Sequence, residues 1–294
     1  MTAMLKKTLL IGLTLLVAVG AAAYFLAPRE PVYHGRTLDQ WIGATDENTN
    51  DVAAAEGLRQ VVPIAVPYYI DQLSTRESWF NRAWLSTWSK LPDAAHEWLP
   101  EATPATMRRI NAAMKLKYLG PAGRAAVPGL LRACEDEDDG VRQCAVDAVG
   151  AVRPAITTAL PPLMKALKDP FRGVRRSAAE ALALYGPEAH GATPALAIAL
   201  KDEDGTVCAC AAGALWAIDH QTNVAMETLS VVIKDKNPTA RALAAMYFGE
   251  IGPPARSVVP TLIEALKDFK DVHEQAADAL KKIDPEAATK AGVH

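Results

Sequence analysis

The stretch LPPLMKALKDPFRGVRRSAAEALALYGPEA, residues 160–189, contains one complete unit of a pattern that governs most of the chain. Its first part places Leu163 and Leu167 at helical spacing, and its second part repeats that apolar spacing from Val174 to Tyr185. A proline near the start of the first part and a Gly-Pro pair after the second suit helix boundaries. The sequence therefore predicts two helices, the first over 160–168, joined by a turn.

The unit recurs every 33 residues from residue 120 onward. The recurring positions hold leucine (Leu130, Leu163, Leu196, Leu229, Leu262), aspartate (Asp136, Asp169, Asp202, Asp235, Asp268), alanine (Ala145, Ala178, Ala211, Ala244) and proline (Pro128, Pro161, Pro194, Pro260). Gly-Pro pairs stand at every second unit, beginning at Gly120, Gly186 and Gly252. We expect the aspartate to accept hydrogen bonds from free backbone N–H groups in the turn between the helices.

The repeated stretch resembles a HEAT repeat of the short type found in many bacterial proteins. Ankyrin repeats share the period but carry a Thr-Pro-Leu-His signature that is missing here. The resemblance implies an all-α fold: a right-handed α-solenoid of about seven HEAT-like helix pairs, preceded by one N-terminal transmembrane helix.

The repeats fall into two regions. Residues 121–294 hold the regular 33-residue units, with a polar tail as the C-terminal cap. Residues 58–120 hold irregular units, in which Val66–Leu73 and Trp79–Leu91 are predicted to pair and Met107–Leu119 is predicted to be a second helix.

Residues 1–27 have the pattern of a signal anchor. Lys6 and Lys7 precede an uncharged apolar run over residues 8–27, which is long enough to cross a bilayer as a helix. Lysines ahead of the run favour a cytoplasmic N-terminus, which sends the repeats to the periplasmic side of the cytoplasmic membrane. The alternative is a secreted protein, cleaved near Ala23.

Residues 28–57 are predicted to be a juxtamembrane linker. Within it, PVYHGRTLDQWI (residues 31–42) resembles a short segment that follows the anchor in some membrane-attached bacterial HEAT proteins. The polar residues 43–52 are predicted to form a loop.

Composition argues for a binding protein. The net charge of −3 and the lack of a basic balance disfavour a nucleic-acid partner. No Ser/His/Asp set, Gly-rich phosphate loop or zinc spacing is present in the sequence, so we predict no catalytic residue, metal, cofactor or small-molecule substrate. The hypothesis is a scaffold that binds a protein partner, of a kind the sequence does not identify, on its concave surface.

The alternative hypothesis is a HEAT-like enzyme, either a di-iron hydroxylase or a lyase. Resemblance to the hydroxylases would require four His–carboxylate pairs, and only His96-Glu97 and His273-Glu274 occur. Resemblance to the HEAT-like bilin lyases is of fold alone, because nothing in the sequence marks a chromophore pocket.

Two groups of residues are candidates for partner binding. The first is the arginines near the start of the second helices (Arg142, Arg175, Arg176, Arg241), and the second is three tryptophans (Trp79, Trp84, Trp88). The arginines could instead form a ladder, each bonded to the turn aspartate of its own or an adjacent repeat. The tryptophans could instead form a buried stripe, because Trp84 and Trp88 follow helical spacing.

Two further patterns have structural interpretations. Cys134 and Cys144 face each other across one predicted hairpin, so a disulfide between them stays open, whereas Cys208 and Cys210 point in different directions. The acidic run Glu135–Asp139 lacks the ligand spacing of a calcium loop and is predicted to be a solvated turn.

Overall fold

The computed structural model describes residues 30–47, 52–91, 96 and 103–293. They form two compact units, divided inside one helix at Leu116 and Lys117, whereas the boundary predicted from the sequence follows residue 120. No helix among the described residues is both long enough and apolar enough to cross a membrane. The transmembrane segment predicted over residues 8–27 lies outside the described residues.

The first unit begins with a small hairpin on a helical pair. Its elements are β1 (Val32–Tyr33), β2 (Arg36–Thr37), α2 (Leu38–Glu47), α3 (Val52–Leu73) and α4 (Trp79–Trp88), with α6 (Ala105–Leu119) reaching into the second unit. The described part of the stretch predicted as a linker, residues 30–47 and 52–57, thus contains the hairpin, α2 and the start of α3. The loop predicted over 43–52 is wrong for residues 43–47, which extend α2, and for Val52, which begins α3.

The short motif that follows the predicted anchor has a clear structural role. Gly35, at φ +76°, lets the chain turn between β1 and β2. Leu38 is fully buried, and the Trp41 indole N–H donates to the Tyr33 carbonyl oxygen at 3.1 Å. Gly57 on α3 makes room for the Trp41 ring, since a Cβ at that position would lie 2.3 Å from Cζ3. Burial of these residues holds α2 against α3.

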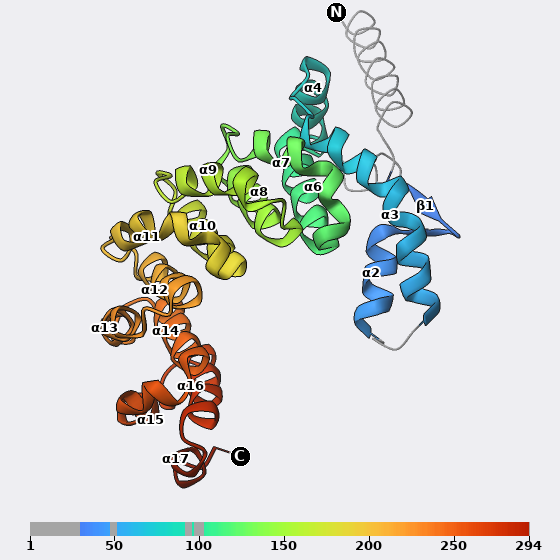
Figure 1. Cartoon of the computed structure of the whole chain (residues 1–294). Helices are drawn as coiled ribbons and strands as arrows, with labels where there is room; N and C mark the ends of the chain where they lie inside the picture. Colours follow the sequence, from blue (N-terminus) through green and yellow to red (C-terminus); the bar gives the residue numbers. More distant parts are fainter. Residues whose placement is uncertain (1–29, 48–51, 92–95, 97–102, 294) are drawn as a thin grey trace, which may run out of the picture. The chain divides into compact units, whose positions relative to one another are not determined.

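The second unit is an array of helix pairs (Figure 1). The first helices of the pairs are α7 (Val127–Ala133), α9 (Ile156–Ala166), α11 (Thr193–Ala199), α13 (Thr222–Val232) and α15 (Val259–Ala265). The second helices are α8 (Asp139–Val152), α10 (Arg172–Tyr185), α12 (Gly205–Asp219), α14 (Pro238–Ile251) and α16 (Lys270–Ile283), and α17 (Pro285–Lys290) follows. The solenoid-like repeat fold expected from the sequence is confirmed for this unit.

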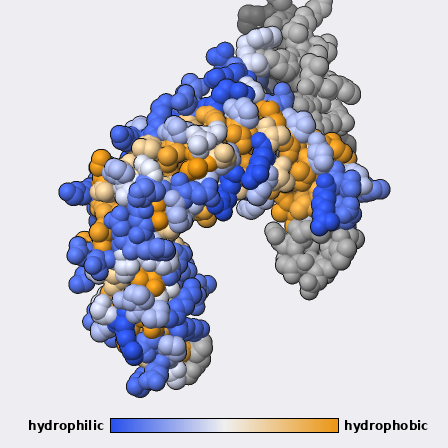
Figure 2. Space-filling view, viewed as in Figure 1, coloured by the Kyte–Doolittle hydropathy of each residue, from blue (hydrophilic) through white to orange (hydrophobic). Residues whose placement is uncertain are grey.

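The recurring leucines and alanines form the core of the array. Each of the five leucines and the four alanines at the 33-residue spacing is fully buried. In the last pair, Val272, Ala276 and Leu280 are fully buried after the register shifts by one residue. Figure 2 shows apolar side chains gathered between hydrophilic ones along the array. The predicted periodic core is therefore confirmed.

The second helices pack directly against one another from α8 to α16, whereas the first helices mainly contact second helices. Small residues permit this close approach: a Cβ on Gly150 of α8 would lie 2.8 Å from the Cβ of Ala181 on α10. In Figure 1 the array curves, with the second helices on the inner, concave side of the unit and the first helices on the outer side.

The first helices alternate between two forms. The Gly-Pro units begin with a 3-10 segment, η1 (Gly120–Ala126), η2 (Gly186–Ala192) or η3 (Pro253–Val258), and the α-helix then starts beside the recurring proline. The prediction that residues 160–168 form a helix opened by its proline is wrong for α9, which begins at Ile156 and contains Pro161. The physical reason is that Arg153, in the left-handed region at φ +50°, ends α8 without a Gly-Pro pair, and the next helix forms earlier.

The number of pairs is settled only within the array, which has five. The irregular units predicted for 58–120 differ from expectation, because α3 starts at Val52 rather than near Val66 and packs against α2. Residues 92–95 and 97–102 lie outside the described residues, so the count of about seven remains a prediction.

Candidate functional site

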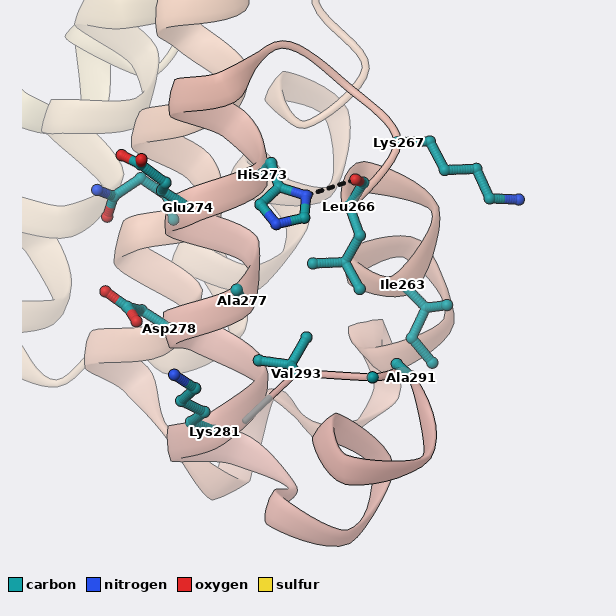
Figure 3. A pocket seen from close by; sticks show the side chains of 12 residues that line it. Ile263, Leu266, Lys267, His273, Glu274, Ala277, Asp278, Lys281, Ala291 and Val293 are labelled. Carbon is teal, nitrogen blue, oxygen red and sulfur yellow. Dashed lines mark hydrogen bonds between the residues drawn. The ribbon is translucent and has the colours of Figure 1, made fainter.

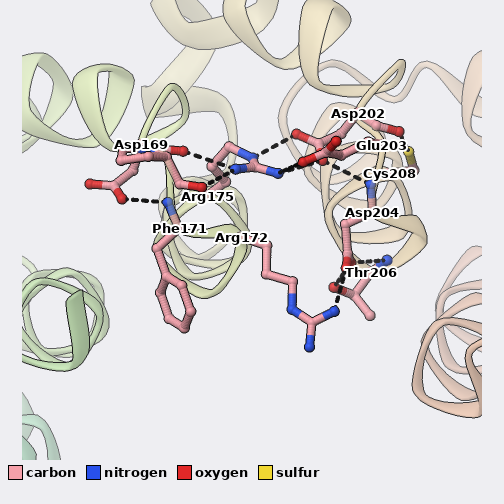
Figure 4. Close-up of polar contacts among 10 residues, drawn as sticks. Asp169, Phe171, Arg172, Arg175, Asp202, Glu203, Asp204, Thr206 and Cys208 are labelled. Atoms are coloured by element: carbon pink, nitrogen blue, oxygen red, sulfur yellow. Dashed lines mark hydrogen bonds and ion pairs between the residues drawn. The ribbon is translucent and has the colours of Figure 1, made fainter.

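The arginines predicted from the repeat form a ladder with the turn aspartates. Arg175 of α10 donates from Nε to Asp202 Oδ2 at 2.7 Å and from Nη2 to Asp202 Oδ1 at 2.8 Å. Its Nη1 donates to the carbonyl oxygens of Asp169 and Pro170 in its own turn. Figure 4 shows this arginine between the two turns. Arg175 therefore joins its own repeat to the next one.

The same bonds recur one repeat before and two repeats after. Arg142 bonds Asp169 at 2.8 and 3.0 Å, and Arg241 bonds Asp268 at 2.7 and 2.6 Å. In each case the aspartate lies 27 residues after the arginine, in the adjacent repeat. The ladder alternative is confirmed, and because each guanidinium uses most of its N–H groups inside the array, it acts first as a structural group.

Electrostatics follow from this geometry. Burial raises the pKa of the Asp169 carboxyl, but hydrogen bonds from Arg142 and the Phe171 amide outweigh it and hold that pKa below its usual range. The side-chain bond to Asp202 raises the pKa of Arg175 above its already high value. Both groups are charged at neutral pH.

The depressed pKa of Asp169 predicts a loss of stability in acid. A carboxyl whose folded pKa is lowered stabilises the fold above its unfolded pKa of about 4, and this stability disappears as pH falls through the folded pKa. We expect Asp169→Asn to be less stable than the wild type at pH 7, and the difference to shrink as the pH falls below the unfolded pKa and through the lowered folded pKa of Asp169. Denaturant unfolding at a series of pH values measures the difference in the free energy of unfolding. A difference that does not change with pH would contradict the lowered pKa of Asp169.

Cys208 interrupts the ladder. It occupies the position 33 residues after Arg175, and its thiol lies 3.2 Å from the Asp202 carbonyl oxygen. This contact is equivalent to the one that the Arg175 guanidinium makes with the Asp169 carbonyl oxygen one repeat earlier. Asp235, which an arginine there would bond, accepts the Asn237 amide at 2.7 Å but has no basic side chain within ion-pair distance in the described part of the chain.

The interruption predicts that Cys208→Arg stabilises the array. The new guanidinium would reach the Asp235 carboxylate as its equivalents do, and a hydrogen bond to a charged group contributes about 1.5 to 3 kcal/mol. Urea unfolding of Cys208→Arg alone and combined with Asp235→Asn measures the gain. An equal gain in both proteins would show that the aspartate is not involved.

Arg176 lies beside the ladder but does not join it. Its Nε is 3.5 Å from Glu180 Oε1 on the same helix. Glu180 also accepts a hydrogen bond from the Cys210 thiol at 3.3 Å, which ties α10 to α12. Burial raises the pKa of Cys210 well above its usual value, so the thiol stays protonated. Among the predicted arginines, Arg176 has the most exposed side chain, at 33%.

The three predicted tryptophans differ in how far their side chains are buried. Trp84 is buried and its ring packs 5.6 Å from that of Trp88, which stacks on His96 at 4.6 Å. Trp79, at the start of α4, is 75% exposed. The buried-stripe alternative is therefore correct for Trp84, while Trp79 presents its ring at the surface.

A groove of about 720 Å³ lies near the C-terminus between α15, α16 and the residues after α17. Figure 3 shows His273 directed at the Leu266 carbonyl oxygen, 2.6 Å away, with Glu274 pointing elsewhere. The two side chains of this His-Glu pair do not converge. Glu97 of the other pair lies outside the described residues, and no cluster of three metal-ligating side chains occurs among the described ones.

Cysteines and acidic residues have local structural roles. Cys134 and Cys144 are free thiols, and burial raises the pKa of Cys134 to about 12. In the acidic run, Asp138 caps α8 by accepting the Val141 amide at 3.0 Å, and Glu135 bonds Lys165 at 2.6 Å. The run therefore forms a helix cap and a surface ion pair.

One pair of candidate residues was not predicted from the sequence. Arg124 and Arg153 line a pocket of about 670 Å³ between η1, the residues that join α8 to α9, and the end of α10 with the start of η2. A signal was available, because the positions 66 residues later hold His190 and Asp219, an ordinary base and acid. Comparing alternate repeats, rather than adjacent ones, would have shown the change of sign.

Comparisons with known proteins identify the repeat. A family profile described as HEAT repeats matches residues 96–183 and 160–230. A chain from the complex of CpcE and CpcF of phycocyanin lyase from Nostoc sp. PCC7120 is similar in structure, with a TM-score of 0.53, 23% identity, and coverage of 90% of this chain and 97% of that one. The karyopherin Kap121p, solved bound to the SUMO protease Ulp1p, has a TM-score of 0.50 and 15% identity, with coverage of 86% of this chain and 30% of that one. Comparison with curated protein sequences gives no match.

Proposed function

The chain contains HEAT repeats, and on this premise we propose that it is a non-enzymatic scaffold that binds a protein partner on its concave surface. The proposed scaffold is a right-handed solenoid of about seven helix pairs. It is anchored in the cytoplasmic membrane by residues 8–27, with the repeats on the periplasmic side.

The observation that carries the proposal is the continuous inner surface of second helices. These helices pack on one another from α8 to α16, and ladder bonds join their turns at each step except the one that Cys208 interrupts. The second helices expose apolar and charged side chains together, such as Leu184, 56% exposed, and the exposed Glu250 and Lys281. A stiff surface of mixed chemistry suits the docking of a folded protein, since little ordering is needed on binding.

The two solved structures support a protein partner. Each was solved as a complex with a second protein: CpcE with CpcF, and Kap121p with Ulp1p. Their TM-scores of 0.53 and 0.50 show a shared fold, and the extension to partner binding is our proposal.

Site-specific photocrosslinking in cells that express the full chain tests this surface. A photoreactive residue at Leu184 or Glu250, on second helices, is expected to capture one protein reproducibly. Matched controls at Ile198 and Val231, which are exposed apolar residues of first helices, are expected to give no such adduct. Adducts from the two controls alone would place the partner on the outer surface and refute the proposal.

Membrane attachment is tested by fractionation. The full chain is expected to remain with membranes after a high-salt wash, and a chain that lacks residues 1–27 is expected to be soluble. Recovery of a soluble form that begins near Tyr24 would instead support cleavage and secretion.

The lyase alternative draws on the similarity to the phycocyanin lyase complex, and it predicts a bound or transferred chromophore. The hydroxylase alternative draws on the two His-Glu pairs, and it predicts near-stoichiometric iron. Absorption spectra and metal analysis of the purified full chain distinguish these outcomes from the scaffold.

A further inference from the structure

The pocket that contains Arg124 and Arg153 differs from its equivalents elsewhere in the array. In the unit 66 residues later, the base is His190, whose Nδ1 lies 2.5 Å from Asp219 Oδ1. In the next such unit, Arg256 Nη2 lies 2.8 Å from Asp284 Oδ2, one residue early because of the register shift. Each of these units therefore supplies a carboxylate for its own base.

The first unit of the series has an arginine in place of that carboxylate. Position 153 corresponds to Asp219, and Arg124 corresponds to His190 and Arg256. Arg124 Nη2 donates to the Arg153 carbonyl oxygen at 3.4 Å, so the two residues are neighbours. Two guanidinium groups thus stand where the other units place one base and one acid.

Glu188 compensates for little of this charge. Its Oε1 lies 3.8 Å from Arg153 Nη2, which is too long for a hydrogen bond, and the two side chains are 61% and 46% exposed. No other ion pair of Arg124 or Arg153 occurs among the described residues. Exposed pairs of this kind are weak, so both guanidiniums retain N–H groups for an outside anion.

The pocket also has a fixed aromatic wall. Tyr185 is buried, and its hydroxyl donates to the Pro154 carbonyl oxygen at 3.0 Å. Burial raises the pKa of this hydroxyl to about 12, so it remains neutral. The Arg153 guanidinium lies 5.5 Å from the centroid of the Tyr185 ring, which orients it over an apolar face.

From these contacts we propose that the pocket binds a carboxylate side chain from an acidic segment of a protein partner, through Arg124 and Arg153. A carboxylate is the group that the equivalent units hold at this place, and it matches the planar fork of a guanidinium. The pocket exceeds the size of one carboxylate, so residues beside the acid would lie against Tyr185 and Pro154. This inference rests on the proposed function and specifies the chemistry of the partner.

The test measures binding of a fluorescein-labelled peptide of alternating Asp and Ala to the full-length protein by fluorescence anisotropy at low salt. We expect saturable binding, lost with an Asn-Ala peptide. Arg124→Gln and Arg153→Gln are each expected to weaken it about ten-fold, the equivalent of about 1.4 kcal/mol. Arg256→Gln removes the same charge from an arginine that already has a partner, and it should change the affinity by less than about two-fold.

Arg153→Asp keeps the test interpretable if other variants unfold. It restores the acid found at Asp219, so the protein should stay folded, pair Arg124 internally and lose peptide binding. Equal weakening by Arg256→Gln, retained binding by Arg153→Asp, or no saturable binding by the wild type would overturn the proposal. Displacement by inorganic phosphate at lower concentration than by acetate would reassign the pocket to phosphate. Crosslinking from Leu184 and Glu250 is measured separately, so failure of this pocket is distinguishable from failure of the scaffold function.

Discussion

Asp202→Ala is expected to lower the free energy of unfolding by roughly 3 to 5 kcal/mol, because it strands the Arg175 guanidinium between two repeats. Both side chains of the pair are only 11% exposed, so water cannot replace the lost carboxylate fully. The substitution also removes the acceptor of the Asp204 amide, at 3.0 Å. Urea unfolding followed by circular dichroism measures the change.

Glu203→Ala is the matched control for this experiment. Glu203 also lies near Arg175, at 3.6 Å from Nη2, but its side chain is 90% exposed. We expect a change of less than about 0.5 kcal/mol, as for most surface ion pairs. If the two substitutions cost the same, burial does not decide the strength of the ladder. A near-normal stability in the double variant Arg175→Met/Asp202→Ala would show that the stranded charge, rather than the lost pair, is the source of the cost.

The 33-residue period of the sequence predicts which side chains form the buried core of the array. Leu163 and its equivalents repeat because every unit must fill the same space between neighbours, so sequence spacing and buried position coincide. The ladder was predictable for a related reason, since Arg175 and the turn aspartates share the period. The spacing alone could not show whether each arginine bonds the aspartate of its own repeat or that of the next repeat, because both aspartates lie at a turn.

Helix boundaries were less predictable, because they depend on the residue that ends the preceding helix. Pro161 and Pro194 occupy the same register, yet Pro194 opens α11 while Pro161 lies inside α9. The difference comes from Gly186, whose φ of +56° and ψ of −139° suit glycine and begin a 3-10 segment. Arg153 cannot adopt that conformation at the same cost, so α9 starts earlier.

The candidate pocket was not predicted because it is marked by residues that differ between equivalent repeats, whereas the sequence was compared for residues that recur. Arg124 and Arg153 are ordinary surface residues one at a time, and the period that relates them to His190 and Asp219 is two units long. Their significance depends on which side chains meet across a repeat, and on the Tyr185 ring that comes from the next one. Such contacts between side chains of different repeats follow from the folded structure and not from any single position in the sequence.

Leu182→Ala in α10 is expected to lower the free energy of unfolding by about 2 to 5 kcal/mol, because it leaves a cavity in the middle of the array. Leu182 is fully buried, and α10 packs against both α8 and α12, so neither neighbour can close the space without losing its own contacts. In a repeat array each unit depends on its neighbours, so we expect the loss to extend beyond α10. Hydrogen exchange should therefore accelerate in α8 and α12 more than in α16.

Leu184→Ala provides the matched control on the same helix. The same atoms are removed from a side chain that is 56% exposed, and we expect a change of less than about 0.5 kcal/mol. If exchange in Leu182→Ala accelerates uniformly from α7 to α17, the array unfolds as one cooperative block and its stability is not divided among neighbouring repeats. If it accelerates in α10 alone, the second helices are not coupled, which would remove the physical basis for a stiff inner surface.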